Sequence, residues 1–297
     1  MGKEDTVSPI QAFIKKHPVL TYYALVFAIS WGGILFLVGG PDRIPGSSEQ
    51  VETMMPLVLV ALFAGPSIAG ILMTGLVSGR AGLRELLSRL LRWRVSARWY
   101  AVVLLSAPFL VTIALLALSL LSPEFIPGIV TADNRIALLL FGIGWGLLGG
   151  GLLEELGWTG FAVPMLRLRH TAFTTALIVG LLHGTWHFLI AFWAGGSFSG
   201  GQWSTYVLGI LFFYLGVLPA YRVLMVWVYD HTASLLVAML MHASLSASTL
   251  ILQPPLTGAP LLMWNLALAA ILWVVVAAVA LANGGQVSRQ PLRRRAA

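Results

Sequence analysis

Long apolar runs, separated by short polar segments, make up most of the chain. A helix needs about 20 apolar residues to cross the hydrocarbon core of a bilayer. The runs that reach this length lie at about residues 19–40, 54–77, 99–121, 136–163, 171–194, 204–221, 231–252 and 259–282. The pattern therefore predicts an all-α, polytopic membrane protein with eight transmembrane helices, in a single transmembrane domain over residues 19–282.

The composition supports a membrane protein and narrows its chemistry. Hydrophobic residues make up 58% of the chain and charged residues only 10%, whereas a soluble domain has about 25% charged residues. The first apolar run has full span length and no small-residue cleavage site after it, so we expect a retained helix rather than a signal peptide. No cysteine is present, which excludes a disulfide, a thiolate zinc site and a cysteine nucleophile.

The polar segments alternate in charge along the chain. Every lysine and arginine except Arg43 and Arg135 lies on the side of the membrane that holds the N-terminal segment 1–18 and the basic tail 283–297. This assignment puts Arg222 in a connecting segment on that side. By the positive-inside rule the side is cytoplasmic, and we expect the inner membrane of a bacterium or archaeon. The net charge of +7 then reflects orientation, and we expect no nucleic-acid partner.

Residues 80–98 combine leucines at helical spacing with arginines at the remaining positions. This pattern is typical of an interfacial amphipathic helix, which we expect to lie on the anionic cytoplasmic leaflet. The leucines concerned are Leu83, Leu86, Leu87, Leu90 and Leu91.

Glu154 and Glu155 lie side by side in the fourth apolar run. A buried carboxylate without a partner costs several kcal/mol, and an ionisable residue inside a membrane helix indicates a functional site. The other ionisable residues of the runs are His183, His187 and His242 inside the helices, and Asp230 and His231 at the expected cytoplasmic start of the seventh helix.

A rise of 1.5 Å per residue places these groups at similar depths in the membrane. Counted from the expected cytoplasmic helix ends, Glu154 lies about 18 Å deep, His242 about 17 Å and His187 about 24 Å. The fourth run is rich in glycine between residues 142 and 151, and small residues let helices approach closely. We therefore expect one layer of chemistry inside the membrane, in a cavity that opens to the cytoplasm or laterally to the bilayer.

A carboxylate beside imidazoles can activate water for hydrolysis. Glu154 would accept a proton from water, and a histidine, or a metal ion held by histidines, would orient or acidify that water. His242 and Ser246 are four residues apart, on one helix face, and can donate to a developing oxyanion. The residues alone leave a metal-free site and a zinc site open.

Three stretches, in order, resemble the motifs of the CPBP family of intramembrane proteases, which contains the CAAX prenyl endopeptidases and the bacterial Abi, or bacteriocin-processing, proteins. Residues 154–161, Glu-Glu-Leu-Gly-Trp-Thr-Gly-Phe, are similar to the first motif, EExxxR. Residues 184–188, Gly-Thr-Trp-His-Phe, resemble the second, which centres on a histidine. Residues 240–244, Leu-Met-His-Ala-Ser, begin a match to the third, HxxxN. The resemblance covers about residues 55–252.

The resemblance implies a role for each matching residue. Glu154 and His187 would activate the water, while His242, with Ser246, would bind the water or stabilise the oxyanion. Glu155 would be structural. If the family's site holds zinc, its ligands here would be Glu154, His187 and His242. The implied substrate is a peptide or a lipidated protein, since prenylated CAAX proteins are substrates of eukaryotic relatives.

Three positions depart from the family pattern. Thr159 stands where the family has arginine, so Glu155 loses its expected partner and needs a donor from Thr159 itself or from a neighbouring helix. Ser246 replaces the asparagine of the third motif, and a serine hydroxyl reaches less far. His183 lies where the family often has an aromatic residue, and we expect it to line the cavity in a supporting role.

Two other functions fit parts of the sequence. Altered motifs are also typical of a non-catalytic relative, such as a membrane binding protein or a bacteriocin-immunity protein of the same fold. A proton-coupled transporter would use the same buried glutamate and histidines, but it requires a pathway to both faces of the membrane. A Glu155 without a partner would favour the non-catalytic function.

The charge pattern makes a direct prediction about orientation. A protease-sensitive tag added after residue 297 is expected to be cut in inverted membrane vesicles and protected in intact cells, because the basic tail is retained in the cytoplasm. Cleavage of the tag from outside intact cells would contradict the predicted topology.

Overall fold

The computed structural model describes residues 9–288, and the regular elements in this range are all helices. Eight helical stretches are long and apolar enough to cross a membrane, as the apolar runs predict. Six of these spans are single helices: α2 (Pro18–Val38), α3 (Ser48–Leu90), α4 (Ala97–Ser119), α9 (Ala172–Phe198), α12 (Leu235–Leu252) and α13 (Gly258–Ala282).

The other two spans change their helical geometry along their length. The fourth combines α6 (Arg135–Trp145), η3 (Gly146–Glu154), α7 (Glu155–Gly157), η4 (Trp158–Ala162) and α8 (Val163–Leu166), and the sixth combines α10 (Trp203–Phe212), η5 (Phe213–Val217) and α11 (Leu218–Thr232). The segments η3, η4 and η5 are π-helical. Short helices complete the chain: α1 (Pro9–Lys16), η1 (Pro41–Arg43), η2 (Pro123–Phe125) and α5 (Gly128–Thr131).

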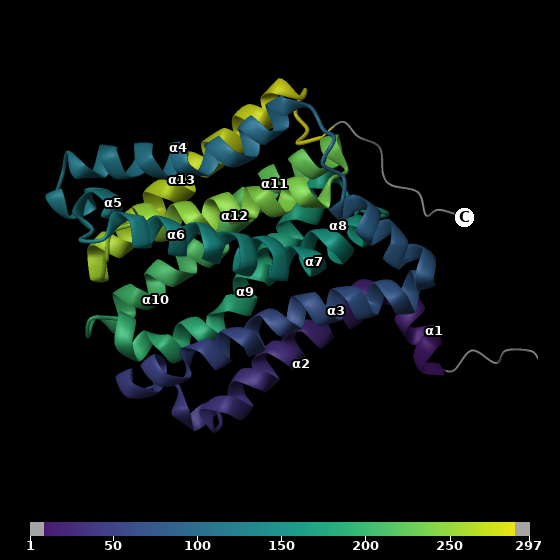
Figure 1. Cartoon of the computed structure of the whole chain (residues 1–297), viewed down its shortest axis with the longest axis horizontal. Coiled ribbons are helices and arrows are strands. Elements are labelled where there is room, and N and C mark those ends of the chain that lie inside the picture. The colour runs from purple at the N-terminus through teal and green to yellow at the C-terminus, as the bar shows by residue number, and fades with distance from the viewer. Residues whose placement is uncertain (1–8, 289–297) are drawn as a thin grey trace, which may run out of the picture.

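Successive spans run antiparallel, so the connections gather at two ends of the bundle (Figure 1). One end, here called the arginine-rich end, carries the connections 91–96, 167–171 and 233–234. The opposite end carries, among others, the connections 199–202 and 253–257. The predicted alternation of the connections is thus present in the fold. Lys3 and the arginines from Arg289 onward lie outside the described residues.

Glycines in η3 let the fourth span pack directly against α12. A methyl group added to Gly146 would come within 2.5 Å of the carbonyl oxygen of Ala243, and one added to Gly150 would overlap the hydroxyl oxygen of Ser246. Close approach of two backbones in a membrane depends on such small residues. The expectation drawn from the glycine-rich run is therefore met at these positions.

The segment expected to be a surface helix over residues 80–98 agrees with that prediction in part: residues 80–90 are helical, and Leu83 and Leu87 are exposed. Gly79 breaks α3 with φ 59° and ψ −153°, and the helix then continues only to Leu90. Leu86 packs against Leu235 and Met239, so one side of this segment is buried in protein. Arg89 is buried as well: it donates to the Tyr229 hydroxyl at 2.8 Å and to a backbone carbonyl at 3.0 Å.

The sixth span is longer than the apolar run predicts. Arg222, Asp230 and His231 all belong to α11, so the expected placement of Arg222 in a connection, and of Asp230 at the start of the seventh helix, is wrong. The helix ends where Ala233 adopts a left-handed conformation, and Ser234 caps α12 by accepting from the Val237 amide. The sequence pattern predicted exposure to water for Arg222 and Asp230, but each forms an ion pair inside the protein.

Asp230 forms a buried ion pair with Arg167 at the arginine-rich end. Arg167 Nη2 lies 2.9 Å from Asp230 Oδ2, and each side chain is 2% exposed. Arg167 also donates to the carbonyl of His170 at 2.7 Å. The pair joins the end of the fourth span to the end of the sixth.

Removing one partner of this ion pair should destabilise the fold. We expect Asp230→Ala to cost about 3–5 kcal/mol, because it leaves a buried arginine without its counter-charge. Thermal unfolding in detergent, followed by tryptophan fluorescence, measures the loss, with the exposed Asp42→Ala as the control for charge removal. The double variant Arg167→Met/Asp230→Leu should recover much of it. Equal unfolding temperatures for Asp230→Ala and Asp42→Ala would contradict this role.

Candidate active site

The buried ionisable residues meet in the interior of the bundle, where four helices converge. Glu154 ends η3 and Glu155 begins α7. They face His183 on α9, Arg222 on α11 and His242 on α12. Segments distant in sequence thus supply one cluster.

Glu155 is fully buried and fully paired. Arg222 donates to its two carboxylate oxygens at 2.8 Å each, in a bidentate arrangement, which is among the strongest ion-pair geometries. Thr159 donates to the same carboxylate, and His242 Nδ1 lies 2.7 Å from Oε1. Glu155 therefore receives donors from its own span and from two neighbouring helices.

This network replaces the arginine that the first motif lacks. The sequence left two donors open for Glu155, namely Thr159 and a neighbouring helix, and the structure provides both. Arg222 was missed because it was counted as a marker of orientation. Its position between apolar stretches, with Tyr221 before it and Val223 after it, was the signal that could have identified it, because an arginine at that depth requires a buried partner.

Glu154 has a different environment from Glu155. It is 3% exposed, and its Oε2 lies 2.6 Å from His183 Nε2 and accepts a hydrogen bond from Trp158 Nε1 at 3.2 Å. The indole of Trp158 packs against both His183 and Trp186, so this wall of the site is aromatic. Neither neighbour of Glu154 carries a fixed positive charge, whereas Glu155 has its own arginine.

The hydrogen bonds indicate which nitrogen of each ring carries a proton. Arg222 Nη2 lies 3.2 Å from His183 Nδ1, and since a guanidinium only donates, Nδ1 must accept. A neutral His183 therefore holds its proton on Nε2, the nitrogen that faces Glu154. His242 donates from Nδ1 to Glu155, which leaves its Nε2 unprotonated in the neutral ring. In the neutral rings, His183 therefore has a protonated Nε2, whereas the Nε2 of His242 is unprotonated and can accept a hydrogen bond.

His187 lies one turn further along α9. Its ring is 5.1 Å from that of His183, and it stacks on Tyr214 at 4.9 Å with an interplanar angle of 5°. The histidine in contact with Glu154 is therefore His183, which the sequence placed in a supporting role, while His187 lines the adjoining cavity.

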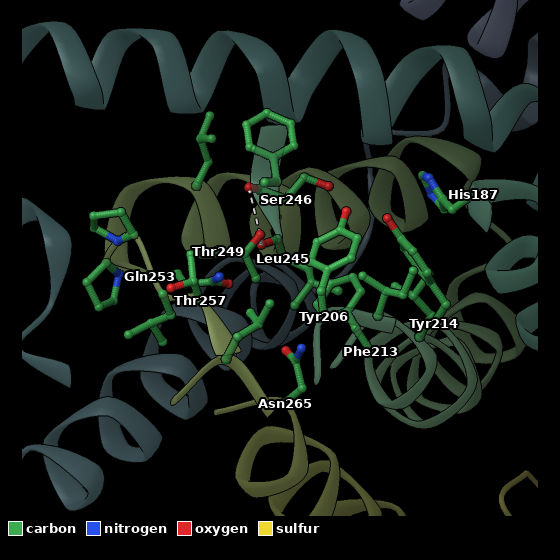
Figure 2. Close-up of a pocket in the computed structure, with 18 of the residues that line it drawn as sticks. His187, Tyr206, Phe213, Tyr214, Leu245, Ser246, Thr249, Gln253, Thr257 and Asn265 are labelled. Carbon is green, nitrogen blue, oxygen red and sulfur yellow. Dashed lines mark hydrogen bonds between the residues drawn. The ribbon is translucent and has the colours of Figure 1, made fainter. Parts of the chain in front are cut away.

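A cavity of about 710 Å³ begins at this cluster. Its inner end is lined by His187, His242 and Ser246, and Figure 2 shows its wall continuing from His187 past Tyr214 and Ser246 toward Gln253 and Thr257. The wall includes residues of the connections 199–202 and 253–257. This cavity follows α12 toward the end opposite the arginine-rich end, and access to the cluster from the cytoplasm or from the bilayer stays a prediction.

Glycine shapes the inner end of this cavity. A methyl group on Gly150 would overlap the Ser246 hydroxyl and lie 3.1 Å from His242 Nε2. The two polar groups therefore face the same bare stretch of backbone, as their four-residue spacing predicts. Glu154 is not among the residues that line the cavity, but its carboxylate lies within 4.8 Å of a ring nitrogen of His242, which does line it.

The candidate metal ligands do not fit a zinc ion as they are arranged. Ligand atoms of Glu154, His183 and His242 lie within 4.8 Å of one another. However, His183 could bind zinc through Nε2 only by losing the proton there while Nδ1 still accepts from Arg222, which would leave the ring as an anion. His187, the ligand implied by the family resemblance, is not part of this group.

One family model matches the part of the chain that contains these residues. The model described as type II CAAX prenyl endopeptidase Rce1-like matches residues 135–248. This range includes Glu154, Glu155, His187, Arg222 and His242. No curated protein sequence matches the chain. The match agrees with the family predicted from the three motifs: residues 135–248 of this integral membrane protein are similar to the CAAX-protease family of membrane peptidases.

Proposed function

We propose that the protein is an intramembrane endopeptidase in which Glu154 activates the water that hydrolyses a peptide bond. The observation that carries the proposal is the contrast between the two glutamates. Glu155 is neutralised by Arg222, whereas Glu154 is buried against an imidazole and an indole. In an apolar site, a carboxylate without a fixed counter-charge binds a proton more readily than one paired with a cation. A general base must accept a proton during the reaction, so Glu154 suits this role better than Glu155.

The reaction requires one proton to move from water to the leaving amine. Glu154 takes that proton as the water oxygen bonds to the carbonyl carbon, and returns it to the nitrogen as the carbon–nitrogen bond breaks. The contact between His183 Nε2 and Glu154 Oε2 positions the carboxylate. His242 accepts from the water through its unprotonated Nε2, so of the two roles implied by the family, binding the water suits this tautomer better than stabilising the oxyanion.

The inner end of the cavity would hold the scissile carbonyl. Ser246 and His187 line it, and each can donate a hydrogen bond to the oxyanion of the tetrahedral intermediate. Glu155, Arg222 and Thr159 act through His242: their network holds Nδ1–H and thereby fixes the orientation of the ring. A carboxylate that accepts a hydrogen bond from one ring nitrogen of a histidine fixes which of the two nitrogens carries the proton.

The substrate is proposed to be a peptide or a lipidated protein. This follows the type II CAAX prenyl endopeptidase family model. Placement in the inner membrane with both termini in the cytoplasm remains a prediction of the charge pattern, as does contact of the basic segments with anionic lipid.

Replacing Glu154 should abolish cleavage without disturbing the fold. With the protein in reconstituted membranes and a panel of lipidated and unlipidated peptides, Glu154→Gln is expected to lower kcat by about 10²–10⁴-fold, the usual contribution of a general base. His187→Ala should lower it less. The exposed His231→Ala is the control. A zinc chelator should have no effect, because the ligand set does not fit zinc.

Several outcomes would contradict this site. Cleavage that persists in Glu154→Gln would exclude Glu154 as the base. Cleavage lost with the chelator and restored by zinc would establish a metal mechanism instead. If no peptide of the panel is cleaved by the wild type, while the folded protein binds one of them, the non-catalytic binding function gains support.

Moving the arginine back to its motif position tests the role of the Glu155 network. Arg222→Leu should reduce both stability and kcat, because Glu155 and His242 lose their ordering partner. The double variant Thr159→Arg/Arg222→Leu is expected to recover a substantial part of kcat, since both side chains contact the same carboxylate. Cleavage kinetics and unfolding temperature are measured together. A double variant that regains stability but no activity would show that Arg222 has another role.

A further inference from the structure

We propose that Trp158 is a positioning residue for Glu154, and that two tyrosines of the first span, Tyr22 and Tyr23, hold its indole in place. The inference rests on the proposed function and deepens it in two ways. It assigns the oxygen of Glu154 that takes the proton from water. It also adds to the site a span, α2, that lies outside the residues matched by the family model.

The first support is that Glu154 is held through only one of its two carboxylate oxygens. Oε2 accepts the hydrogen bond from Trp158 Nε1 at 3.2 Å, and the same oxygen lies 2.6 Å from His183 Nε2. Among the described residues, none donates a hydrogen bond to Oε1. A carboxylate held in this way keeps the lone pairs of its second oxygen available for a proton. Oε1 is therefore the oxygen that accepts the proton, while Oε2 fixes the orientation of the group.

The second support is that the donor is itself fixed by aromatic contacts from the first span. Tyr23 stacks on Trp158 with ring centroids 5.8 Å apart and an interplanar angle of 23°, and Tyr22 meets the indole edge-on at 5.9 Å and 89°. All three side chains are buried. Offset-stacked and edge-to-face pairs are favoured arrangements, and a ring packed at interior density cannot turn without displacing its neighbours. These contacts therefore fix the direction of the Trp158 N–H group.

The third support is the close packing that brings the two tyrosines to this position. Gly157 precedes Trp158, and a methyl group added there would overlap the Tyr22 hydroxyl and the backbone carbonyl of Pro66 in α3. Within the described part of the chain, neither tyrosine hydroxyl has a hydrogen-bond partner. The tyrosines therefore act through their rings, and the first span packs directly against the segment that follows the two glutamates.

Replacing the indole tests the positioning role. In reconstituted membranes, Trp158→Phe keeps an aromatic ring but removes the N–H group, and we expect kcat to fall about 10–100-fold, because a small misplacement of a catalytic group is costly. KM should change less than about twofold, since the contact is to the base and not to the substrate. Unfolding temperature is measured on the same samples.

Trp193→Phe is the matched control for lost volume. Trp193 lies on α9, is as fully buried as Trp158, and its indole nitrogen has no hydrogen-bond partner among the described residues. Both variants should lower the unfolding temperature by similar amounts, while only Trp158→Phe lowers kcat. An equal fall of kcat in the two variants would show a general effect of packing and would overturn the proposal.

The kinetic outcomes separate this inference from the proposed function. Wild-type kcat in Trp158→Phe, in a preparation in which Glu154→Gln is inactive, would overturn the positioning role and leave Glu154 as the base. Cleavage that persists in Glu154→Gln would refute the proposed function and, with it, the assignment of Oε1.

The contact between Trp158 and Glu154 can also be tested without catalysis. In nuclear magnetic resonance spectra of the full chain with isotope-labelled tryptophan, the indole N–H signal missing from Trp158→Phe belongs to Trp158, and Trp193→Phe identifies that of Trp193. Glu154→Gln should shift the Trp158 signal and leave the Trp193 signal in place, because it removes the charge of the acceptor. A Trp158 signal that does not move would show that its N–H group is not bound to Glu154.

The role of the first span is tested by a double-variant cycle. Tyr23→Phe, which keeps the ring, should keep the wild-type kcat, whereas Tyr23→Leu should lower it. In the Trp158→Phe background, Tyr23→Leu should have little further effect on kcat, because the tyrosine acts through the indole N–H group that this background lacks. Losses that multiply independently would show that Tyr23 does not act through Trp158.

Discussion

The bidentate ion pair between Glu155 and Arg222 is the interaction on which the rest of the site depends. It joins the fourth span to the sixth, and through His242 it also fixes the seventh. Burying two charges is costly unless each is fully bonded, and Thr159 completes the bonding of the carboxylate. The pair therefore determines how these three spans approach one another.

The same ion pair gives two adjacent glutamates different chemistry. Since Glu155 uses the arginine, Glu154 is left with His183 and Trp158. A second cation at that point would hold Glu154 as a permanent carboxylate and weaken it as a base. Glu154 ends η3 and Glu155 begins α7, and because adjacent residues leave a helix about 100° apart, each side chain reaches its own set of partners.

The apolar runs and glycines predicted the spans and their close packing, because both depend on local sequence. The prediction was weaker where a charge is paired through the fold. Arg222, Asp230 and Arg89 resembled markers of the water interface, yet each is buried against a residue 67, 63 or 140 positions away. The sequence predicted only a supporting role for His183 for the same reason. Its contact with Glu154 depends on how the fourth span approaches α9, which the local sequence does not show.

The two ends of the bundle also differ in how they use polarity. At the arginine-rich end, charged residues form buried pairs within the protein. Toward the opposite end, polar but uncharged groups line an open cavity. Charged pairs are rigid and exclude water when fully bonded, whereas hydroxyl and amide groups can exchange water for a ligand at small cost. Among the described residues, the ion pairs that hold Glu155 and His242 in place are therefore distinct from the neutral groups that line the cavity.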